Sequence, residues 1–408
     1  MIPPTTHHGF SITALSSPAP VVHMDLDTDV AVIGGGVAGL TAAWRLAASG
    51  KQVTLFEARS RLGGRVQTAA PAPLADRPWV DLGPAWFWPH QRAIRSVVDL
   101  MGLSVVEQYR EGLAMYDAGH GDAPDAFDAS MQSSPAYRLD GGIASLVDAL
   151  AAGMQAAARQ AAVPPVSVRL HAAVQSLAQH PDGVVVRGHG FRCTANRVVM
   201  AVPPRVVARD VSWTPPLPDS VREILADTVT WMGHAMKCVV SYEAPFWRTA
   251  GRSGYAVSWR GPLREIHDAC TPAGASHVAA YALMGFASPR TTHAAIAFRD
   301  ATMDERRAAV IAQLERLFGV GARDVVDYAE YDWSRDVHSS GVRDDQPAAE
   351  HPVYGHAIFE GRFDLPSWND RVVWAGAETT AIGGGYLEGA VASGLRAAAT
   401  IASVRSTP

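Results

Sequence analysis

The segment from residue 29 to residue 58, DVAVIGGGVAGLTAAWRLAASGKQVTLFEA, restricts the fold of this chain more than any other part. Its apolar pattern predicts a strand over 29–33, a glycine turn, a helix over 37–49 that ends before Gly50, and a second strand over 52–56. A strand, a tight turn, a helix and a further strand in this order form the first unit of a Rossmann-like α/β domain.

Three glycines and one acid within this segment predict a dinucleotide site. In the pattern GxGxxG, Gly34 allows the tight turn, Gly36 lets the backbone approach a pyrophosphate, and Gly39 lets the helix pack closely on the strand. The amides and the dipole at the start of the helix would hold the phosphates. Glu57 follows the second strand, about 20 residues after the glycines, where its carboxylate can accept hydrogen bonds from ribose hydroxyls.

The bulk composition restricts the class of protein. A length of 408 residues and a hydrophobic content of 48% predict two domains with a large interior. A net charge of −5 gives neither a basic surface for nucleic acid nor a polybasic patch for a membrane, and no apolar run is long enough for a membrane span. Residues 1–27, rich in Pro, Ser and Thr, are expected to form a disordered leader and not a signal peptide.

Cysteine and histidine usage indicates a reducing compartment and no metal. Cys193, Cys238 and Cys270 form no CxxC pair, so we expect a cytoplasmic protein without a disulfide framework. The chain has no HExxH and no Cys/His ligand spacing, and we assign no metal site.

A lysine interrupts an apolar strand in the segment HAMKCVVSYEAPFW near the middle of the chain. Met236, Cys238 and Val240 are expected on one face of the strand and Val239 on the other. Only two of the 35 basic residues are lysines. Because a charged ammonium in an apolar strand is unfavourable without water or a partner, Lys237 either has a role that arginine cannot fill or reaches solvent from an edge strand.

The segment after the second predicted strand decides between NAD and FAD. EARSRLGGRVQT, residues 57–68, carries a second glycine pair flanked by arginines. Glu-Ala-Arg followed by Leu-Gly-Gly-Arg resembles the FAD fingerprint of the flavin amine oxidase superfamily, which includes monoamine, polyamine and L-amino-acid oxidases. The resemblance implies that Glu57 holds the adenosine ribose and that Arg59 and Arg65 lie along the ribose and the diphosphate.

The resemblance extends over residues 28–404. VDLGPAWFWPHQ (80–91) is similar to the segment that passes beside the flavin ring, although Pro84 stands where the family has a second small residue. YRLDGGIASLVDAL is similar to the re-entry into the FAD domain, and MKCVVSYEAPFW to the family's lysine strand. VVWAGAETTAIGGGYLEGAVASGLRAA is similar to the closing FAD motif, whose last helix begins at Tyr386-Leu387 and points at the flavin.

The resemblance also implies which residues bind the cofactor, and how. The expected FAD-binding residues are Gly34, Gly36, Val37, Ala38, Gly39, Glu57, Ala58, Arg59, Gly63, Gly64, Arg65, Gly83, Pro84, Ala85, Trp86, Val174, Gly376, Glu378, Tyr386 and Leu387. Monoamine oxidases bind FAD covalently through a cysteine in the region that matches Val342. This chain has no cysteine after Cys270, so the resemblance implies non-covalent FAD.

The implied fold is α/β, with a Rossmann-like FAD-binding domain and a discontinuous substrate domain of mixed sheet plus helices. The FAD-binding domain would take residues 28–90, 140–225 and 335–404, and the substrate domain residues 91–139 and 226–334. Within the substrate domain, the spacing of Ala308, Ile311, Leu314 and Phe318 predicts a helix over 303–318.

Lys237 and Tyr386 are the implied catalytic residues. In the superfamily the matching lysine reaches flavin N5 through a water and assists oxygen activation or imine hydrolysis. An arginine is a poor substitute because it is planar and stays protonated, whereas a buried lysine can shift its pKa. In amine oxidases, two aromatic rings guide the amine to the flavin, and Tyr386 matches one of them.

The implied substrate site is mainly apolar. The second ring of the pair maps near Val342 and Arg343, so Trp86, Trp88 or Trp333 could supply the missing wall. The expected substrate-binding residues are Trp86, Trp88, Arg343 and Tyr386. Amino-acid oxidases hold the substrate carboxylate with an arginine in the segment matching 84–90, which is apolar and aromatic here. This segment favours a hydrophobic amine as the substrate. Because Arg343 could bind a carboxylate, an amino acid is kept as the alternative substrate.

The resemblance therefore implies an FAD-dependent amine oxidase acting on a small-molecule amine and O2. A hydride would pass from the α-carbon of a hydrophobic amine to flavin N5, and O2 would reoxidise the flavin to give H2O2 and an imine that hydrolyses to an aldehyde. The alternatives are an FAD-dependent desaturase or dehydrogenase, an L-amino-acid or tailoring oxidase, and, more distantly, a non-catalytic binding protein like the Rab GDP-dissociation inhibitors. The sequence does not determine the oligomeric state, and a homodimer is one of the possible states.

Overall fold

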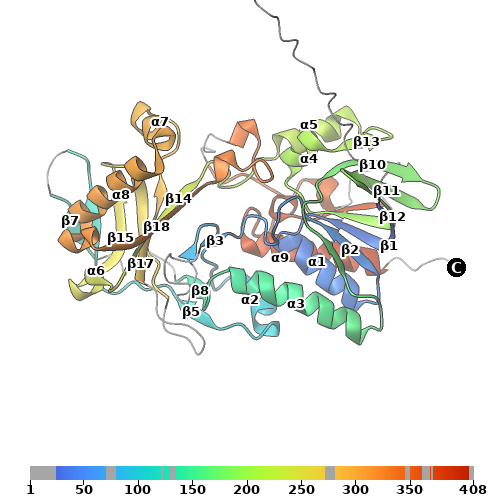
Figure 1. Cartoon of the computed structure of the whole chain (residues 1–408), viewed down its shortest axis with the longest axis horizontal. Helices are drawn as coiled ribbons and strands as arrows, with labels where there is room; N and C mark the ends of the chain where they lie inside the picture. Colours follow the sequence, from blue (N-terminus) through green and yellow to red (C-terminus); the bar gives the residue numbers. More distant parts are fainter. Residues whose placement is uncertain are drawn as a thin grey trace, which may run out of the picture.

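Two large β-sheets with helices packed against them form the body of the molecule (Figure 1). The computed structural model describes residues 24–69, 80–120, 123–128, 135–271, 281–344, 350–360, 368 and 371–403. In Figure 1 the first sheet lies at the right with α1, α3 and α9, and the second at the left with α6, α7 and α8.

The first sheet has the topology that the glycine motif predicts. Its strands are β1 (Met24–Ile33), β2 (Val53–Phe56), β9 (Ser167–Arg169), β10 (Val174–His180), β11 (Gly183–Gly188), β12 (Phe191–Met200), β13 (Ser212–Thr214) and β19 (Val372–Trp374). The order is β13-β10-β11-β12-β1-β2-β9, with β19 paired to β12. β1 lies between β12 and β2 and is parallel to both. The ladder begins at Met24, so residues 24–27, expected in the leader, belong to β1.

Alternate side chains of β1 enter two different cores. Val30 and Val32 pack with the helices α1 (Val37–Ala48), α3 (Ala144–Gln160) and α9 (Leu387–Ser403). Ala31 and Ile33 pack on the opposite face, in a core that includes residues of α4 (Pro204–Asp210) and α5 (Asp219–Asp227). Because both faces are covered, the strand is apolar at every one of these positions, as parallel strands in α/β proteins are.

The second sheet is mixed and contains the lysine strand at an inner position. Its strands are β6 (Leu113–Asp117), β7 (Asp125–Phe127), β14 (Met236–Tyr242), β15 (Arg252–Ser258), β16 (Leu263–Asp268), β17 (Tyr281–Ala287) and β18 (Val325–Asp332). The order is β18-β14-β17-β16-β15-β6-β7. Since β14 pairs with β17 and β18, the alternative that Lys237 reaches solvent from an edge strand is wrong.

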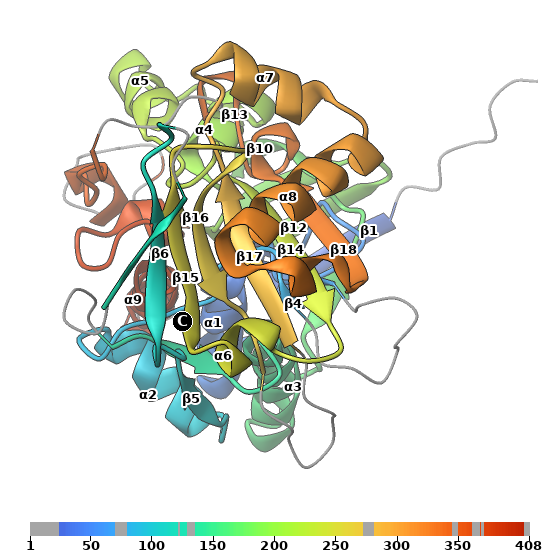
Figure 2. The same ribbon diagram turned by 90° about the vertical axis from the view of Figure 1, so that its left-hand side faces the viewer.

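Helices cover one face of the second sheet, and its other face is turned toward the first sheet (Figures 1 and 2). The covering helices are α6 (Phe246–Thr249), α7 (His293–Asp300) and α8 (Met303–Phe318). The bounds of α8 agree with the predicted 303–318, but its buried face contains Val310 and Leu317, whereas Ala308 is exposed. Met236, Cys238 and Val240 of β14 pack on the helix side and Val239 on the other, as predicted.

The remaining elements are short. They are α2 (Arg92–Leu100), the paired strands β3 (Thr68–Ala69) and β4 (Val80–Asp81), the paired strands β5 (Val105–Glu107) and β8 (Tyr137–Leu139), and the 3-10 turns η1 (Val320–Arg323), η2 (Trp333–Arg335), η3 (Val342–Asp344), η4 (Ala357–Glu360) and η5 (Ala377–Thr379). Among the described residues, no helix has the length and apolar character needed to cross a membrane.

Candidate active site

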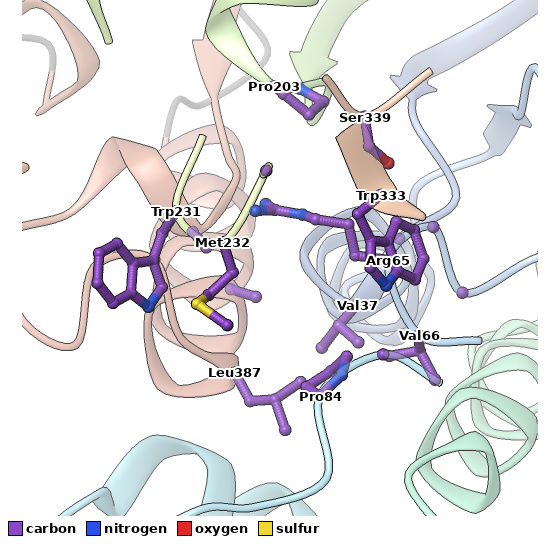
Figure 3. A pocket seen from close by; sticks show the side chains of 18 of the residues that line it. Val37, Arg65, Val66, Pro84, Pro203, Trp231, Met232, Trp333, Ser339 and Leu387 are labelled. Carbon is purple, nitrogen blue, oxygen red and sulfur yellow. The ribbon is translucent and has the colours of Figure 1, made fainter. Parts of the chain in front are cut away.

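A cavity of about 940 Å³ is lined by residues of both sheets and of the segments between them. This volume is near the upper end of small-molecule sites, so the cavity can hold more than one small amine. Figure 3 shows that its lining comes from distant parts of the chain, with Arg65, Pro84, Trp231, Met232 and Leu387 around it.

The turn after β1 depends on glycine at two positions. Gly34 has φ +105°, and a Cβ there would lie 2.6 Å from the carbonyl oxygen of Ala201. A Cβ on Gly39 would lie 1.9 Å from the carbonyl oxygen of Gly34, so α1 can pack against the turn only without a side chain at this position. Gly36 differs, because a Cβ on this residue would have no close protein neighbour within 3.9 Å, and Gly36 lines the cavity.

Glu57 is fixed at the end of β2 by backbone amides. Its Oε2 accepts a hydrogen bond from Gly35 N at 2.7 Å, and its Oε1 accepts one from Arg59 N at 2.9 Å. The residue is buried and lines the cavity. Its carboxylate is therefore positioned beside the glycine turn, as the dinucleotide motif predicts.

Arg59 connects this turn to a segment that the sequence did not associate with it. Its Nη2 donates to Asp336 Oδ1 at 2.5 Å and to Ser339 Oγ at 2.7 Å. Tyr331 donates to the other oxygen of Asp336 at 2.6 Å. No spacing rule links residues 277 positions apart, so only the fold could reveal this contact.

Arg65 and Glu378, both expected at the cofactor, contact each other. Arg65 donates two hydrogen bonds to the Glu378 carboxylate, at 2.5 and 2.9 Å. The side chain of Glu378 is fully buried, and Arg65 lines the cavity. Burial opposes the charge of Arg65, but the Glu378 carboxylate more than offsets this and raises the pKa of the guanidinium. The pair thus connects the first cofactor motif to the last at the wall of the cavity.

Lys237 is 1% exposed and lines the cavity from β14. Its Nζ donates to the carbonyl oxygen of Gly83 at 2.9 Å and lies 5.7 Å from the ring of Trp86 and 5.6 Å from that of Phe286. Burial lowers the pKa of Lys237 to about 7, although the Asp81 carboxylate acts in the opposite direction. The lysine can therefore hold or release a proton near neutral pH.

Three aromatic side chains gather around Tyr386, just before α9 begins. The ring centroid of Trp88 lies 5.7 Å away at an interplanar angle of 78°, and that of Trp231 lies 6.4 Å away at 61°. His351 stacks on Tyr386 at 5.1 Å and 7°. Trp88 was expected here, whereas Trp231 and His351 lie outside every cofactor motif and could not be identified from spacing.

Trp86 and Trp333 also line the cavity, and each indole N–H has a partner. Trp86 Nε1 donates to Gln108 Oε1 at 2.7 Å, and Trp333 Nε1 donates to the carbonyl oxygen of Leu82 at 2.9 Å. Satisfied indoles of this kind present a fixed apolar ring to a ligand.

The cavity brings together most of the residues expected at the site. Those that line it are Gly34, Gly36, Val37, Ala38, Glu57, Ala58, Arg59, Gly63, Gly64, Arg65, Gly83, Pro84, Ala85, Trp86, Trp88, Val174, Lys237, Gly376, Glu378, Tyr386 and Leu387. Gly39 is not among the lining residues, since it packs against Gly34 behind the turn.

The expectation that Arg343 binds substrate requires correction. Its side chain is 57% exposed, donates to Asp227 Oδ1 at 2.9 Å and also bonds to the carbonyl oxygen of Ala226. Arg343 is not among the residues that line the cavity. Its charge is used in a surface ion pair, so it supplies no cation for a substrate carboxylate.

The residues present fit a flavin dinucleotide. At Gly36 the turn lines the cavity without a side chain, the fixed Glu57 carboxylate stands beside the turn, and the cavity continues to the start of α9 at Leu387. Each of these features is what a pyrophosphate, a ribose and an electron-accepting ring require.

Comparisons with known proteins agree with this site. Residues 120–402 match the family described as flavin containing amine oxidoreductase, and residues 32–100 match the NAD(P)-binding Rossmann-like domain. The first match covers more than half of the chain. The chain therefore belongs to the flavin-containing amine oxidoreductases, and the alternative of a non-catalytic binding protein is set aside.

Individual relatives are distant but match over most of their length. Putrescine oxidase of Kocuria rosea is 24% identical, over 92% of this chain and 95% of the relative. The flavin-containing amine oxidase of Danio rerio is 26% identical, over 90% of this chain and 84% of the relative. A solved structure of putrescine oxidase bound to putrescine has a TM-score of 0.74 at 23% identity, covering 93% of this chain and 99% of that one, a likeness of fold.

Proposed function

We propose that this protein is an oxidase that removes a hydride from the α-carbon of a hydrophobic amine, with O2 as the electron acceptor and with H2O2 and an imine, later an aldehyde, as products. The observation that carries the proposal is the buried Lys237, which shares one cavity with Tyr386 and the surrounding indoles. Family membership gives the general activity, and the nature of this cavity supports the hydrophobic amine.

We also propose non-covalent FAD as the flavin. Gly36 and the start of α1 would hold the diphosphate, Glu57 a ribose, and the start of α9 at Leu387 the flavin ring. When bound, the flavin accepts the two electrons of the amine and passes them to O2. In this proposal, residues 28–90, 140–225 and 335–404 form the FAD-binding domain, and residues 91–139 and 226–334 form the substrate domain.

The residues of this chain would act mainly on the charge and the position of the amine. The indoles of Trp86, Trp88 and Trp231 form an apolar surface, which favours the neutral amine over its ammonium form. The ring of Tyr386 would orient the α-carbon. Lys237 would present one compact donor whose proton can be held or released near pH 7.

The decisive experiment is anaerobic absorbance of the purified protein, before and after mixing with a panel of amines. Bleaching of the flavin band by hydrophobic amines, followed by recovery and H2O2 on admission of air, is the expected result. A flavin band that no amine bleaches would contradict the proposal and favour a desaturase or a tailoring oxidase. Bleaching by free amino acids alone would instead assign an amino-acid oxidase.

A further inference from the structure

One side chain of the cavity contains sulfur, and the proposed oxidation assigns it no role. Met232 lines the cavity and is half-buried. Figure 3 draws it among the labelled side chains of the pocket. No other methionine and no cysteine is found among the lining residues, which all belong to the described part of the chain. A thioether is therefore held in the same cavity as the proposed reaction.

A strained turn holds Met232 at the wall of the cavity. Its φ is +58°, a left-handed conformation that few residues other than glycine adopt. Gly233 N donates to the carbonyl oxygen of Thr230 at 3.0 Å. Ala235 N donates to the carbonyl oxygen of Met232 at 2.9 Å, and Thr230 N donates to Asp344 Oδ1 at 3.1 Å. The position of Met232 is thus determined by its surroundings, as is usual for strained residues at ligand sites.

The cysteines are protected from oxidation in two ways that do not apply to Met232. Cys193, Cys238 and Cys270 are buried and do not line the cavity. Burial also raises the pKa of each of these thiols to about 12. Peroxides oxidise the thiolate and not the thiol, so these cysteines should react slowly. A thioether has no proton to lose, and its oxidation depends on access to the sulfur.

Other methionines differ from Met232 in their access to the cavity. Met236 and Met284, on the paired strands β14 and β17, are each 2% exposed. Met24 and Met303 are 43% and 49% exposed, but neither lines the cavity. H2O2 that forms inside the cavity would therefore have Met232 as its nearest accessible thioether, whereas H2O2 in the solvent would have Met24 and Met303.

We propose that Met232 is oxidised to its sulfoxide by the H2O2 that the cavity produces, and that this modification lowers the activity of the enzyme. The peroxide O–O bond breaks and one oxygen forms a bond to Sδ. The sulfur loses two electrons, and the other oxygen leaves as water with both hydrogens. The inference rests on the proposed function, which supplies the oxidant.

The sulfoxide would change the chemical character of the substrate site. Met232 follows Trp231, whose ring lies 6.4 Å from that of Tyr386. A sulfoxide converts a flexible apolar side chain into a polar one. It would hold water beside the apolar surface that is proposed to favour a hydrophobic, neutral amine. Because methionine sulfoxide reductases reverse this modification, the loss of activity would be reversible.

The test follows the oxidation of single methionines during turnover. The flavin-loaded wild type oxidises a saturating hydrophobic amine with catalase in excess, so that H2O2 that leaves the protein is destroyed. Peptide mass spectrometry then measures the sulfoxide at Met232 and at Met303. We expect Met232 to be oxidised in step with turnover and Met303 to stay unmodified. H2O2 added to the resting enzyme without catalase should instead oxidise Met303, which is exposed to solvent.

Variants connect the modification to the activity. Met232→Leu removes the sulfur and keeps an apolar side chain of similar volume, so it should hold its own initial rate throughout the reaction. Met303→Leu is the matched control and should lose activity as the wild type does. Met232→Gln introduces a polar group of similar length and should lower kcat/KM for amines from the first turnover. Methionine sulfoxide reductases should restore the activity of the inactivated wild type.

Three contrary outcomes distinguish the parts of this proposal. Met232 that stays unmodified during turnover, or that is oxidised only when catalase is left out, would overturn oxidation within the cavity. Equal loss of activity in the wild type and Met232→Leu, or full activity of the oxidised wild type, would overturn the effect on activity. Failure of every amine to give H2O2 would instead overturn the proposed function.

Discussion

Lys237 offers the sharpest test of a single side chain in this cavity. Lys237→Met keeps the length of the side chain and removes both its charge and the hydrogen bond to Gly83. We expect the variant to stay yellow and to reoxidise with O2 about 100-fold more slowly, since a preorganised charge at the reaction centre is lost. Stopped-flow absorbance measures the rate, and Lys51→Met is the control. Reoxidation at the wild-type rate would remove Lys237 from this step.

The shifted pKa of Lys237 also predicts how stability depends on pH. The folded protein binds this proton with a pKa of about 7, whereas an unfolded lysine has a pKa of about 10.4. Between these values the unfolded chain holds a proton that the folded chain lacks. The free energy of unfolding of the wild type should therefore rise with pH relative to Lys237→Met, by up to about 1.4 kcal/mol per pH unit.

Denaturant unfolding of the flavin-loaded proteins at pH 7.5, 8.5 and 9.5 measures this difference. Because other titrating groups are common to both proteins, their effects cancel in the comparison. Parallel stability profiles would show that Lys237 keeps an ordinary pKa in the folded state.

Tyr386 should act on the amine more than on the cofactor. Tyr386→Ala removes the ring that packs near Trp88 and Trp231, and we expect kcat/KM for amines to fall about tenfold, the size of a lost aromatic contact. Tyr386→Phe keeps the ring and should stay near the wild type. Flavin content, read from the absorbance ratio, should be equal in all three. Loss of flavin in Tyr386→Ala would recast the residue as structural.

The place of a residue in the site could be predicted where a sequence motif determines which residues surround it. Glu57 follows a strand at a fixed distance from the glycines, so its contact with Gly35 N is a local consequence of the sequence. Trp231 and Glu265 belong to no such spacing, and only the tertiary packing brings them to the cavity, as it brings His351 onto the ring of Tyr386. Arg343 was misjudged for the same reason, because its neighbour Asp227 is 116 positions away.

The turn between β1 and α1 predicts different effects for two glycines of one motif. Gly39→Ala would place a methyl 1.9 Å from the Gly34 carbonyl oxygen and should destabilise the protein by about 1–3 kcal/mol. Gly36→Ala has room within the protein and an ordinary φ of −74°, so it should keep the fold and weaken FAD binding. Thermal unfolding without cofactor and FAD titration separate the effects. Equal stability of both variants would contradict the packing argument.

Most elements near the motifs could be predicted, whereas their sheet neighbours could not. The predicted helix over 303–318 agrees with α8, because its caps and periodicity are local. The prediction of which face of this helix is buried was partly wrong, because the helix packs on strands that are distant in sequence, β14 among them. Pairing of β14 between β17 and β18 likewise required the structure, and this pairing explains why Lys237 is buried.

The molecule as a whole should be stabilised by FAD, because the cavity joins both sheets. A ligand at 100 times its dissociation constant adds about 2.7 kcal/mol to the free energy of unfolding. We expect added FAD to raise the Tm of the cofactor-free protein and NAD to leave it unchanged. In Glu57→Ala a given FAD concentration should produce a smaller rise. An equal rise in this variant would contradict the assignment of Glu57 to a ribose.

The contact between Arg65 and Glu378 has a consequence for how the protein is made. These residues are 313 positions apart, and a ribosome working at about 5–20 residues per second separates them by roughly 15–60 s. A nascent chain that has already formed the glycine turn still lacks Glu378, the partner of Arg65 in the proposed cofactor site. We therefore expect the flavin to bind after translation, and a chain truncated before Glu378 to be colourless.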